Sequence, residues 1–335
     1  MKKDVPYSSS RSKTPWTDDE NATPLQSFID ITNKHTYDIK HNKVKDTPEE
    51  IAMLNTYTPE RCGHCGSRNF MRYGKTSAGL VRFKCRDCGR TFNILTGTIF
   101  QNHKIPLTEQ LEFALELFRY DSFNSISKSN RNSSATTKYW IKKLFTILKD
   151  YQRGILLSGK VYIDETLYKV RAPDIVYKSE MKEPRGRSDN QMIIGVGYDG
   201  NKVIALYMGN RSVTNSRVIK CYGTHIISGS TLIHDKEPCH NILVDLLKLN
   251  SIAYKATTKK IPDNRNPLHP IDHICMLLQT FLDSHSGFLR EDIQGYLNLF
   301  CFKMNEGNNP YETVNNLLDR AIKYQATLSF RDCFR

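Results

Sequence analysis

Four cysteines in the N-terminal third of the chain have the residue type and spacing of a metal site. Cys62 and Cys65 form one Cys-x-x-Cys pair, Cys85 and Cys88 form a second, and 19 residues separate the pairs. Two thiolates on one tight turn can grip the same ion, and a glycine after each pair lets the backbone turn its amides toward the sulfurs. Four thiolates close a tetrahedral Zn²⁺ site with no open position. The pattern therefore predicts a zinc ion that holds a small fold together.

Strong positive charge surrounds these cysteines. Residues 61–104 contain nine Lys and Arg but one acid, Asp87, in a chain of net charge +13. Localised positive charge on a small metal-bound module is typical of a surface that binds nucleic acid. We predict that Arg82, Arg86 and Arg90 contact the DNA backbone. The alternative is a generally basic, solvated surface.

A second set of residues suited to chemistry is acidic. Residues 161–164 and 231–235 have the composition of buried strands, and each segment ends in an aspartate, Asp164 and Asp235. A carboxylate at the end of a buried strand is costly without a partner, and a divalent ion is one such partner. Two ions held by carboxylates can activate an attacking oxygen and stabilise a leaving one in phosphodiester chemistry. Asp272, at the start of an expected helix, is the candidate third carboxylate. A capping role for each aspartate is the alternative.

The elements that must position these acids read as an α/β domain over residues 158–305. A strand at 161–164 is followed by strands at 192–198 and 202–208 around Asp199-Gly200, which favours a hairpin turn. Helices and strands then alternate to the end of the domain. This order of elements is that of an RNase H-like domain, so we expect the two strand-borne aspartates to lie near each other.

Between the cysteines and this domain, residues 105–150 read as three helices. Residues 122–149 hold six Lys and Arg and no acid. A helix pair with a polar turn and a basic last helix resembles a helix-turn-helix, so we predict DNA contacts from Thr137, Lys138 and Lys142. A plain helical bundle linking two domains is the alternative. Two further arginines, Arg185 and Arg187, lie in a basic loop that could hold the DNA backbone or could simply be solvated.

The whole chain is thus expected to be a multidomain α+β protein. The expected parts are a polar arm with the composition of a disordered segment at 1–46, a zinc ribbon at 47–104, helix-turn-helix-like helices at 105–150, the RNase H-like α/β catalytic domain at 158–305, and a C-terminal helix and tail at 306–335. No run of 18 apolar residues and no signal-peptide core is present, so no membrane partner is expected. The five cysteines outside the two pairs read as reduced thiols. These features predict a cytoplasmic, nucleoid-associated protein.

Several segments together resemble a known family. They are Cys85-Arg86-Asp87-Cys88-Gly89-Arg90-Thr91-Phe92, Leu95-Thr96-Gly97-Thr98, Ile163-Asp164-Glu165-Thr166, Pro184-Arg185-Gly186-Arg187, Leu232-Ile233-His234-Asp235, Gly287 and Tyr296-Leu297. With them the chain resembles DDE transposases of bacterial insertion sequences, in the zinc-ribbon branch related to Merlin elements. The resemblance spans roughly residues 50–305.

The resemblance implies a transposase that binds the terminal inverted repeats of its element and uses Mg²⁺ or Mn²⁺ to cut and transfer DNA strands, acting as a homodimer or larger assembly. It implies Asp164 as the first metal ligand and Asp235 as the second. The family's third ligand is Glu or Asn, often followed two turns later by Lys; here these positions hold Asp272 and Gln279. Glu291 and Asp292 are alternative third ligands.

Two other readings stay open, the first of them because of the departures at Asp272 and Gln279. One is a DNA-binding protein with a degenerate, catalytically inactive RNase H-like domain. The other is a nuclease that resolves branched DNA.

Overall fold

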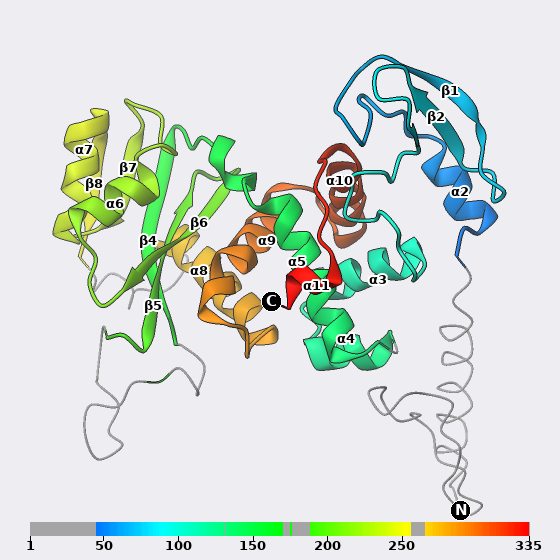
Figure 1. Ribbon diagram of the computed structural model, residues 1–335. Coiled ribbons are helices and arrows are strands. Elements are labelled where there is room, and N and C mark those ends of the chain that lie inside the picture. Colours follow the sequence, from blue (N-terminus) through cyan, green and yellow to red (C-terminus); the bar gives the residue numbers. More distant parts are fainter. Residues whose placement is uncertain (1–44, 131, 170–174, 176–187, 256–264, 335) are drawn as a thin grey trace, which may run out of the picture. The chain divides into compact units, whose positions relative to one another are not determined.

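The computed structural model describes residues 45–130, 132–169, 175, 188–255 and 265–334. It divides into two compact units, one of residues 1–147 with 310–335 and one of residues 148–309, called unit 1 and unit 2 below (Figure 1). Nearly all of the predicted polar arm lies outside the described residues, as do Arg185 and Arg187. None of the helices within the described ranges has the length and apolar character needed to span a bilayer.

Unit 1 begins with helix α2, Pro48–Leu54, whose start was predicted from its capping residues. The Thr47 side chain accepts a hydrogen bond from the backbone N–H of Glu50 at 3.3 Å, and proline occupies the first turn. In a capping box the Glu50 carboxylate would accept a hydrogen bond from the backbone N–H of Thr47. Here it accepts one from the backbone N–H of Asp46 at 2.9 Å. The reciprocal bond is therefore one residue earlier than in the usual capping box.

A small antiparallel sheet follows α2. Its strands, in the order β1-β2-β3, are β1 Phe70–Lys75, β2 Val81–Cys85 and β3 Thr91–Phe92. The first two agree with the predicted strands. Phe70, Phe83 and Phe92 pack together, with ring centroids 5.3 to 5.7 Å apart. This aromatic cluster is very small for a hydrophobic core, so the module needs a further stabilising element.

The rest of unit 1 is helical. Its helices are α3 Leu107–Phe118, α4 Phe123–Ser129, α5 Ser134–Leu148, α10 Pro310–Lys323 and α11 Phe330–Cys333. On α3, Leu111 and Leu115 are half-buried while Phe113 and Leu117 are fully buried. Both α4 and α10 contact α3, so its buried face is wider than one leucine stripe and is turned toward Phe113.

Unit 2 is built on a five-stranded sheet with the order β6-β5-β4-β7-β8. The strands are β4 Lys160–Lys169, β5 Gln191–Tyr198, β6 Val203–Asn210, β7 Thr231–Asp235 and β8 Asn250–Tyr254. β4, β5 and β6 are antiparallel neighbours, whereas β7 and β8 run parallel to β4. The predicted hairpin between β5 and β6 is present, with Gly200 at φ +92°.

Helices cover both faces of this sheet (Figure 1). They are α6 Asn215–Tyr222, α7 Asn241–Leu247, α8 His269–Ser284 and α9 Ile293–Asn305, with 3-10 turns η1 Tyr151–Gly154, η3 Pro238–His240 and η6 Arg290–Asp292. On one face, Val161, Ile163 and Leu232 pack into an apolar core with residues of α6 and α7. On the other, α8 contacts β4 and β5, and α9 contacts β6.

Two predicted boundaries in unit 2 were wrong. The predicted strand ending at Asp164 continues to Lys169, because β5 pairs with β4 along its whole second half. The predicted helix over residues 239–249 is a 3-10 turn followed by α7, which ends where Lys248 adopts a left-handed conformation at φ +54°. That residue reverses the chain and lets β8 begin at Asn250.

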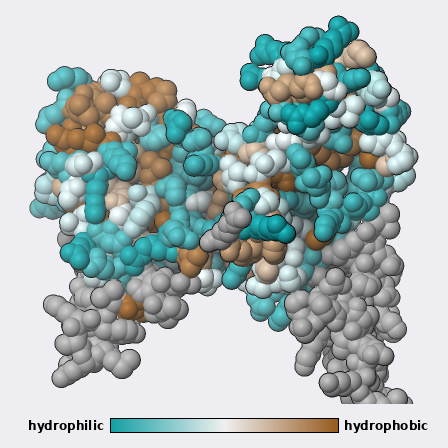
Figure 2. Space-filling model, in the orientation of Figure 1, coloured by the Kyte–Doolittle hydropathy of each residue, from teal (hydrophilic) through white to brown (hydrophobic). Residues whose placement is uncertain are grey.

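The surface of unit 2 is apolar in one region. Figure 2 shows hydrophobic groups over the part of this unit that holds α7 and β8. Leu246 on α7 and Ile252 on β8 are among the exposed side chains. β8 is the edge strand next to β7, so its outer side carries no further strand within the described sheet.

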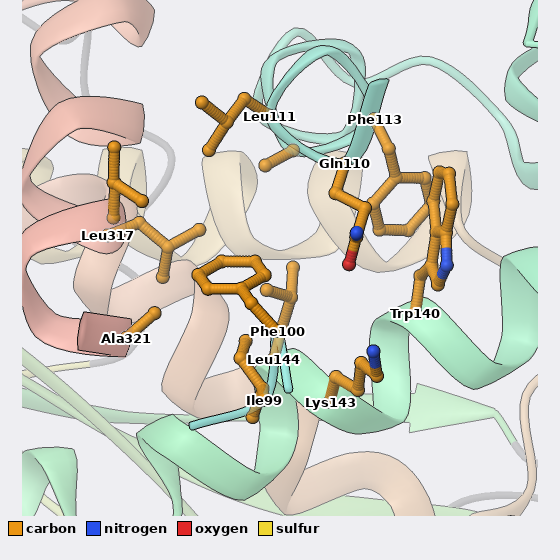
Figure 3. Close-up of a pocket in the computed structure, with 12 residues that line it drawn as sticks. Ile99, Phe100, Gln110, Leu111, Phe113, Trp140, Lys143, Leu144, Leu317 and Ala321 are labelled. Carbon is orange, nitrogen blue, oxygen red and sulfur yellow. The ribbon is translucent and has the colours of Figure 1, made fainter. Parts of the chain in front are cut away.

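A buried lysine lies in the helical core of unit 1. Lys143 on α5 is 5% exposed and lines a cavity of ≈ 20 Å³ among apolar side chains of α3, α5 and α10 (Figure 3). Its Nζ lies 4.7 Å from the ring centroid of Tyr139. Figure 3 shows Lys143 near Trp140 and Phe100. Burial lowers the pKa of Lys143 to about 8, because the charged form is poorly solvated there.

We predict that Lys143→Met stabilises unit 1 at pH 7 by on the order of 1–3 kcal/mol, since it removes the cost of burying the charge. The folded pKa of Lys143, about 8, lies below the unfolded value of 10.5, so wild-type stability should rise between these pH values. Chemical denaturation at pH 7 and pH 10 measures both effects. Lys138→Met, an exposed change on the same helix, is the control. A destabilised Lys143→Met protein at pH 7 would contradict the prediction.

Candidate functional site

The four predicted cysteines come together in unit 1. The ligand atoms of Cys62, Cys65, Cys85 and Cys88 all lie within 4.8 Å of one another. The Sγ–Sγ distances are 3.8 Å between Cys62 and Cys88 and 3.7 Å between Cys65 and Cys85. Four sulfurs at about 2.3 Å from a tetrahedral zinc ion are about 3.8 Å apart, so this cluster has the dimensions of a zinc site.

Backbone amides point at these sulfurs, as predicted from the glycines. The N–H of His64 lies 3.4 Å from Cys62 Sγ, and that of Cys88 lies 3.5 Å from Cys85 Sγ. A hydrogen bond from the Arg90 backbone lowers the pKa of Cys88 to about 6. A backbone hydrogen bond from Ser67 lowers the pKa of Cys65, but burial and the neighbouring thiols outweigh it and raise this pKa to about 12. The His64 ring instead contacts the Thr91 carbonyl oxygen at 3.1 Å, so it is not a fifth ligand.

The Leu95-Thr96-Gly97-Thr98 segment packs directly on the first knuckle. A Cβ on Gly63 would lie 2.2 Å from the Thr96 carbonyl oxygen, and one on Gly97 would lie 2.7 Å from the Gly63 carbonyl oxygen. Gly97 also has φ +79°. The two backbones touch only because both residues lack a side chain, which explains why this segment accompanies the cysteine pairs.

The predicted basic contacts differ in exposure. On the cysteine module (residues 61–104), Arg86 and Arg90 are exposed, whereas Arg82 is half-buried with its guanidinium carbon 6.0 Å from the Tyr73 ring centroid. The Arg86 guanidinium lies 3.7 Å from Met71 Sδ at the surface of the module.

On α5 the predicted contacts also differ. Lys138 is exposed and Lys142 is half-buried, but Thr137 is 3% exposed. The Thr137 hydroxyl donates to the Ser133 carbonyl oxygen at 3.3 Å. Thr137 was predicted to contact DNA, but its side chain is buried, whereas that of Lys138 is accessible.

Asp164 and Asp235 lie on neighbouring parallel strands. The register pairs Tyr162 of β4 with Ile233 of β7, so its continuation by two residues places Asp164 beside Asp235. Because strand side chains alternate, Asp164 points to the face that α8 covers. Asp235, the last residue of β7, has its Oδ1 3.6 Å from His240 Nδ1. Asp164 is 8% exposed and the Asp235 side chain 24% exposed. β7 ends at Asp235 while β4 continues, which leaves this edge open at the carboxyl ends of the parallel strands.

Asp272 lies in the first turn of α8, which packs on the same face of the sheet. Its carboxylate accepts a hydrogen bond from the Asn266 side chain at 3.0 Å. Two turns later, Gln279 Nε2 donates to Thr166 Oγ1 at 2.6 Å, which ties α8 to β4 two residues after Asp164. Glu291 and Asp292 lie instead in the turn η6.

The three carboxylates do not form a tight cluster by themselves. Among the described residues, groups of three or more ligands within 4.8 Å are the four cysteines and His234-Asp235-His240. Asp164, Asp235 and Asp272 are not such a group. Their roles as catalytic ligands stay predictions.

The sequence analysis missed a buried polar network on the opposite face. Glu165 was expected to point away from Asp164 and to make an ion pair; its partner is His240, with Nε2–Oε1 3.1 Å. Burial lowers the pKa of His240, but the Glu165 carboxylate outweighs this and raises it. Burial also lowers the pKa of His234, to about 4. Strand alternation, which puts Glu165 and His234 on one face, was the signal available in the sequence.

Tyr222 and Gly195 complete this network. The Tyr222 hydroxyl lies 3.0 Å from Glu165 Oε1. Gly195 of β5 pairs with Glu165, and a Cβ there would lie 2.8 Å from the Tyr222 hydroxyl. A glycine at this strand position therefore makes room for the tyrosine. Burial, followed by the charge of Glu165, raises the pKa of Tyr222 well above its ordinary value.

Comparison with known proteins finds one informative sequence relative. No family model matches the chain. The chain is 29% identical over 135 residues to an uncharacterized protein in transposable element ISH50 of Halobacterium salinarum. The match covers 38% of this chain and 44% of that protein, so the chain spans less than half the length of this relative.

Solved structures give weaker likenesses. A Mos1 transposase paired-end complex with left transposon end has TM-score 0.30 and 12% identity, covering 70% of this chain and 80% of that chain. The Drosophila P element transposase strand transfer complex has TM-score 0.27 and 11% identity, covering 74% and 64%. A chain of the simian T-cell lymphotropic virus intasome with PP2A regulatory subunit B56 gamma has TM-score 0.29 and 15% identity, covering 61% and 71%. These scores lie below 0.5, so no argument rests on them.

We predict that the four-cysteine cluster binds one zinc ion per chain when no other zinc site is filled. Cys85→Ser should lose that ion and unfold the cysteine module, whose aromatic cluster is too small to fold without metal. Unit 2 should stay folded, because it has its own core. Elemental analysis and circular dichroism of the purified, reduced chain measure both outcomes. Cys301→Ser, at a buried cysteine of unit 2, is the control and should keep the cluster's zinc.

Proposed function

We propose that this chain is an insertion-sequence transposase of the DDE type. The observation that supports the proposal is the parallel register of β4 and β7, in which Tyr162 pairs with Ile233, two residues before Asp164 and Asp235. The sequence likeness to a protein of transposable element ISH50 supports the same class. Terminal inverted repeats of its own element would be the DNA substrate.

The sheet of unit 2 supports an RNase H-like catalytic domain. The strand order is β6-β5-β4-β7-β8, with three antiparallel strands followed by two parallel ones, and the elements follow one another along the chain as expected for such a domain. In parallel α/β sheets, ligands bind outside the carboxyl ends of the strands. Asp235 ends β7, whereas Asp164 lies in the middle of β4, which continues to Lys169.

Divalent ions fit this donor set. Mg²⁺ binds one or two carboxylates together with phosphate oxygens, and Asp164 and Asp235 supply two carboxylates at an open edge. Bound there, Mg²⁺ or Mn²⁺ would polarise the phosphodiester and the attacking oxygen. Asp272 would approach from α8, whose position against β4 is held by the bond from Gln279 to Thr166.

The cysteine module and the helices of unit 1 would bind the DNA. Arg86 and Arg90 are exposed on a module with one acid among nine basic residues, and Lys138 is exposed near the start of α5. Phosphate contacts position a protein on the duplex, whereas helix side chains in a groove read its sequence. Binding as a homodimer or larger assembly would bring two element ends together.

The competing proposal is a DNA-binding protein with an inactive RNase H-like domain. It is favoured by Gln279, which stands where the family often has lysine and is engaged with Thr166. It is also favoured by the spacing of the three carboxylates, which exceeds that of a compact metal group. A cleavage assay separates the two proposals, because both predict DNA binding.

We predict that Asp164→Asn or Asp235→Asn abolishes Mg²⁺-dependent cleavage and strand transfer on DNA carrying the ends of the element, by at least about 10³-fold. Binding of the ends should remain, since the proposed DNA contacts lie in unit 1. The measurement uses the DNA that flanks the gene as substrate. Asp245→Asn, an exposed aspartate on α7, is the matched control. Wild-type protein that binds the ends but cleaves no DNA would establish the inactive-domain alternative.

We predict that DNA affinity falls steeply with salt and that Arg86→Ala or Arg90→Ala weakens binding to all sequences alike. Each lost phosphate contact should reduce the slope of log K against log salt by about one. Lys138→Ala should instead reduce the preference for element ends over random DNA, because it lies on the proposed reading helix. Arg153→Ala, which removes an exposed arginine of unit 2, is the charge control. Affinity that does not change with salt would exclude this DNA-binding surface.

A further inference from the structure

Two buried histidines of unit 2 face each other directly behind Asp235. His234, at the end of β7, is 1% exposed, and His240, in the turn η3, is 0% exposed. Their Nδ1 atoms are 3.1 Å apart, and His240 Nδ1 is 3.6 Å from Asp235 Oδ1. All three ligand atoms lie within 4.8 Å of one another.

These separations match those around a small transition-metal ion. Ligands at about 2.0–2.1 Å from a tetrahedral zinc ion are about 3.3 Å apart. The distances of 3.1 Å between the two Nδ1 atoms and 3.6 Å between His240 Nδ1 and Asp235 Oδ1 lie on either side of that value. Two imidazole nitrogens and one carboxylate oxygen are a common set of three protein ligands that leaves a fourth position for water.

The outer nitrogens of both rings are already held. His240 Nε2 lies 3.1 and 3.2 Å from the two carboxylate oxygens of Glu165, and His234 Nε2 lies 3.1 Å from Ser251 Oγ. Metal-bound histidines nearly always donate their second N–H to such an acceptor, which fixes the tautomer and orients the ring. Here both rings therefore present Nδ1 to the same point.

The charges balance when a divalent ion is bound. Glu165 and Asp235 carry two negative charges, and the two imidazoles are neutral as ligands, so a divalent cation neutralises the group. A buried pair of carboxylates without such a cation is costly. Without metal, a proton on His240 would neutralise one of these charges and leave the other.

An ion can reach this position from solvent. The Asp235 side chain is 24% exposed, and Ser251 lies on the exposed edge strand β8. The site is thus enclosed by the sheet and α7 on one side and open at the strand end on the other.

We propose that His234, Asp235 and His240 bind a transition-metal ion of the zinc class, with Glu165 and Ser251 orienting the two histidines. Nitrogen ligands favour Zn²⁺, Co²⁺ or Ni²⁺ over Mg²⁺, so this site differs in kind from the carboxylate site on the other face. The histidine site shares Asp235 with the carboxylate site, so an ion bound to the histidines would fix the position of the Asp235 side chain. The proposal does not depend on the chain being a transposase.

The experiment counts zinc in the full-length chain after loading with excess Zn²⁺ and desalting. Wild type should hold two zinc ions per chain, Cys85→Ser one and His240→Asn one, and the double variant none. His225→Asn, which changes a buried histidine outside the group, should hold two. Wild type holding a single ion, or Cys85→Ser holding none, would overturn the proposal.

A second measurement guards against a folding defect in His240→Asn. Ser251→Ala keeps all three ligands and should weaken Zn²⁺ binding to the Cys85→Ser chain by about 10- to 100-fold. With Co²⁺, the Cys85→Ser chain should show visible d–d absorption without the thiolate charge-transfer band of the cysteine cluster. Unchanged Zn²⁺ affinity in Ser251→Ala, or no d–d absorption, would also overturn the proposal. Both readouts are independent of DNA cleavage.

Discussion

The parallel pairing of β4 with β7 is the interaction on which the functional part of unit 2 depends. Hydrogen bonds between these strands set the register in which Tyr162 faces Ile233, and two residues later the same register brings Asp164 beside Asp235. A slip by one residue would turn one of the two carboxylates to the opposite face. Val161 and Leu232 pair with each other on these two strands, and both are fully buried on the α6 and α7 face. Because a slip would expose them, they oppose it.

The same alternation builds two chemically different faces from adjacent residues. Asp164 and Thr166 face α8, while Glu165 between them faces the side of α6 and reaches Tyr222 and His240. One strand thus supplies a carboxylate to each side of the sheet. The face toward α8 carries the oxygen ligands of Asp164 and Thr166, whereas the other carries the imidazoles of His234 and His240 together with the Glu165 carboxylate. Asp235, at the end of β7, is within reach of both environments.

Unit 1 depends on a different constraint, the small size of the cysteine module. Three phenylalanines form its core, so the four sulfurs must supply much of the cohesion that a larger core would give. The close contact between Gly63 and Gly97 brings the chain after the strands against the first knuckle. A metal-dependent module of this kind leaves its outer surface available for basic residues such as Arg86.

The sequence by itself determined much of the local structure. Cys-x-x-Cys spacing predicted a cluster that the structure forms, and alternation and turn residues predicted most strands because these signals are local. It did not determine that β4 continues to Lys169, since that length comes from pairing with β5 rather than from local preference. Nor did it reveal that His240 contacts both His234 and Glu165. Glu165 lies 75 residues from His240 in the chain. Such contacts follow from the sheet register and from the turn after β7, and only the tertiary structure brings together side chains so far apart in sequence.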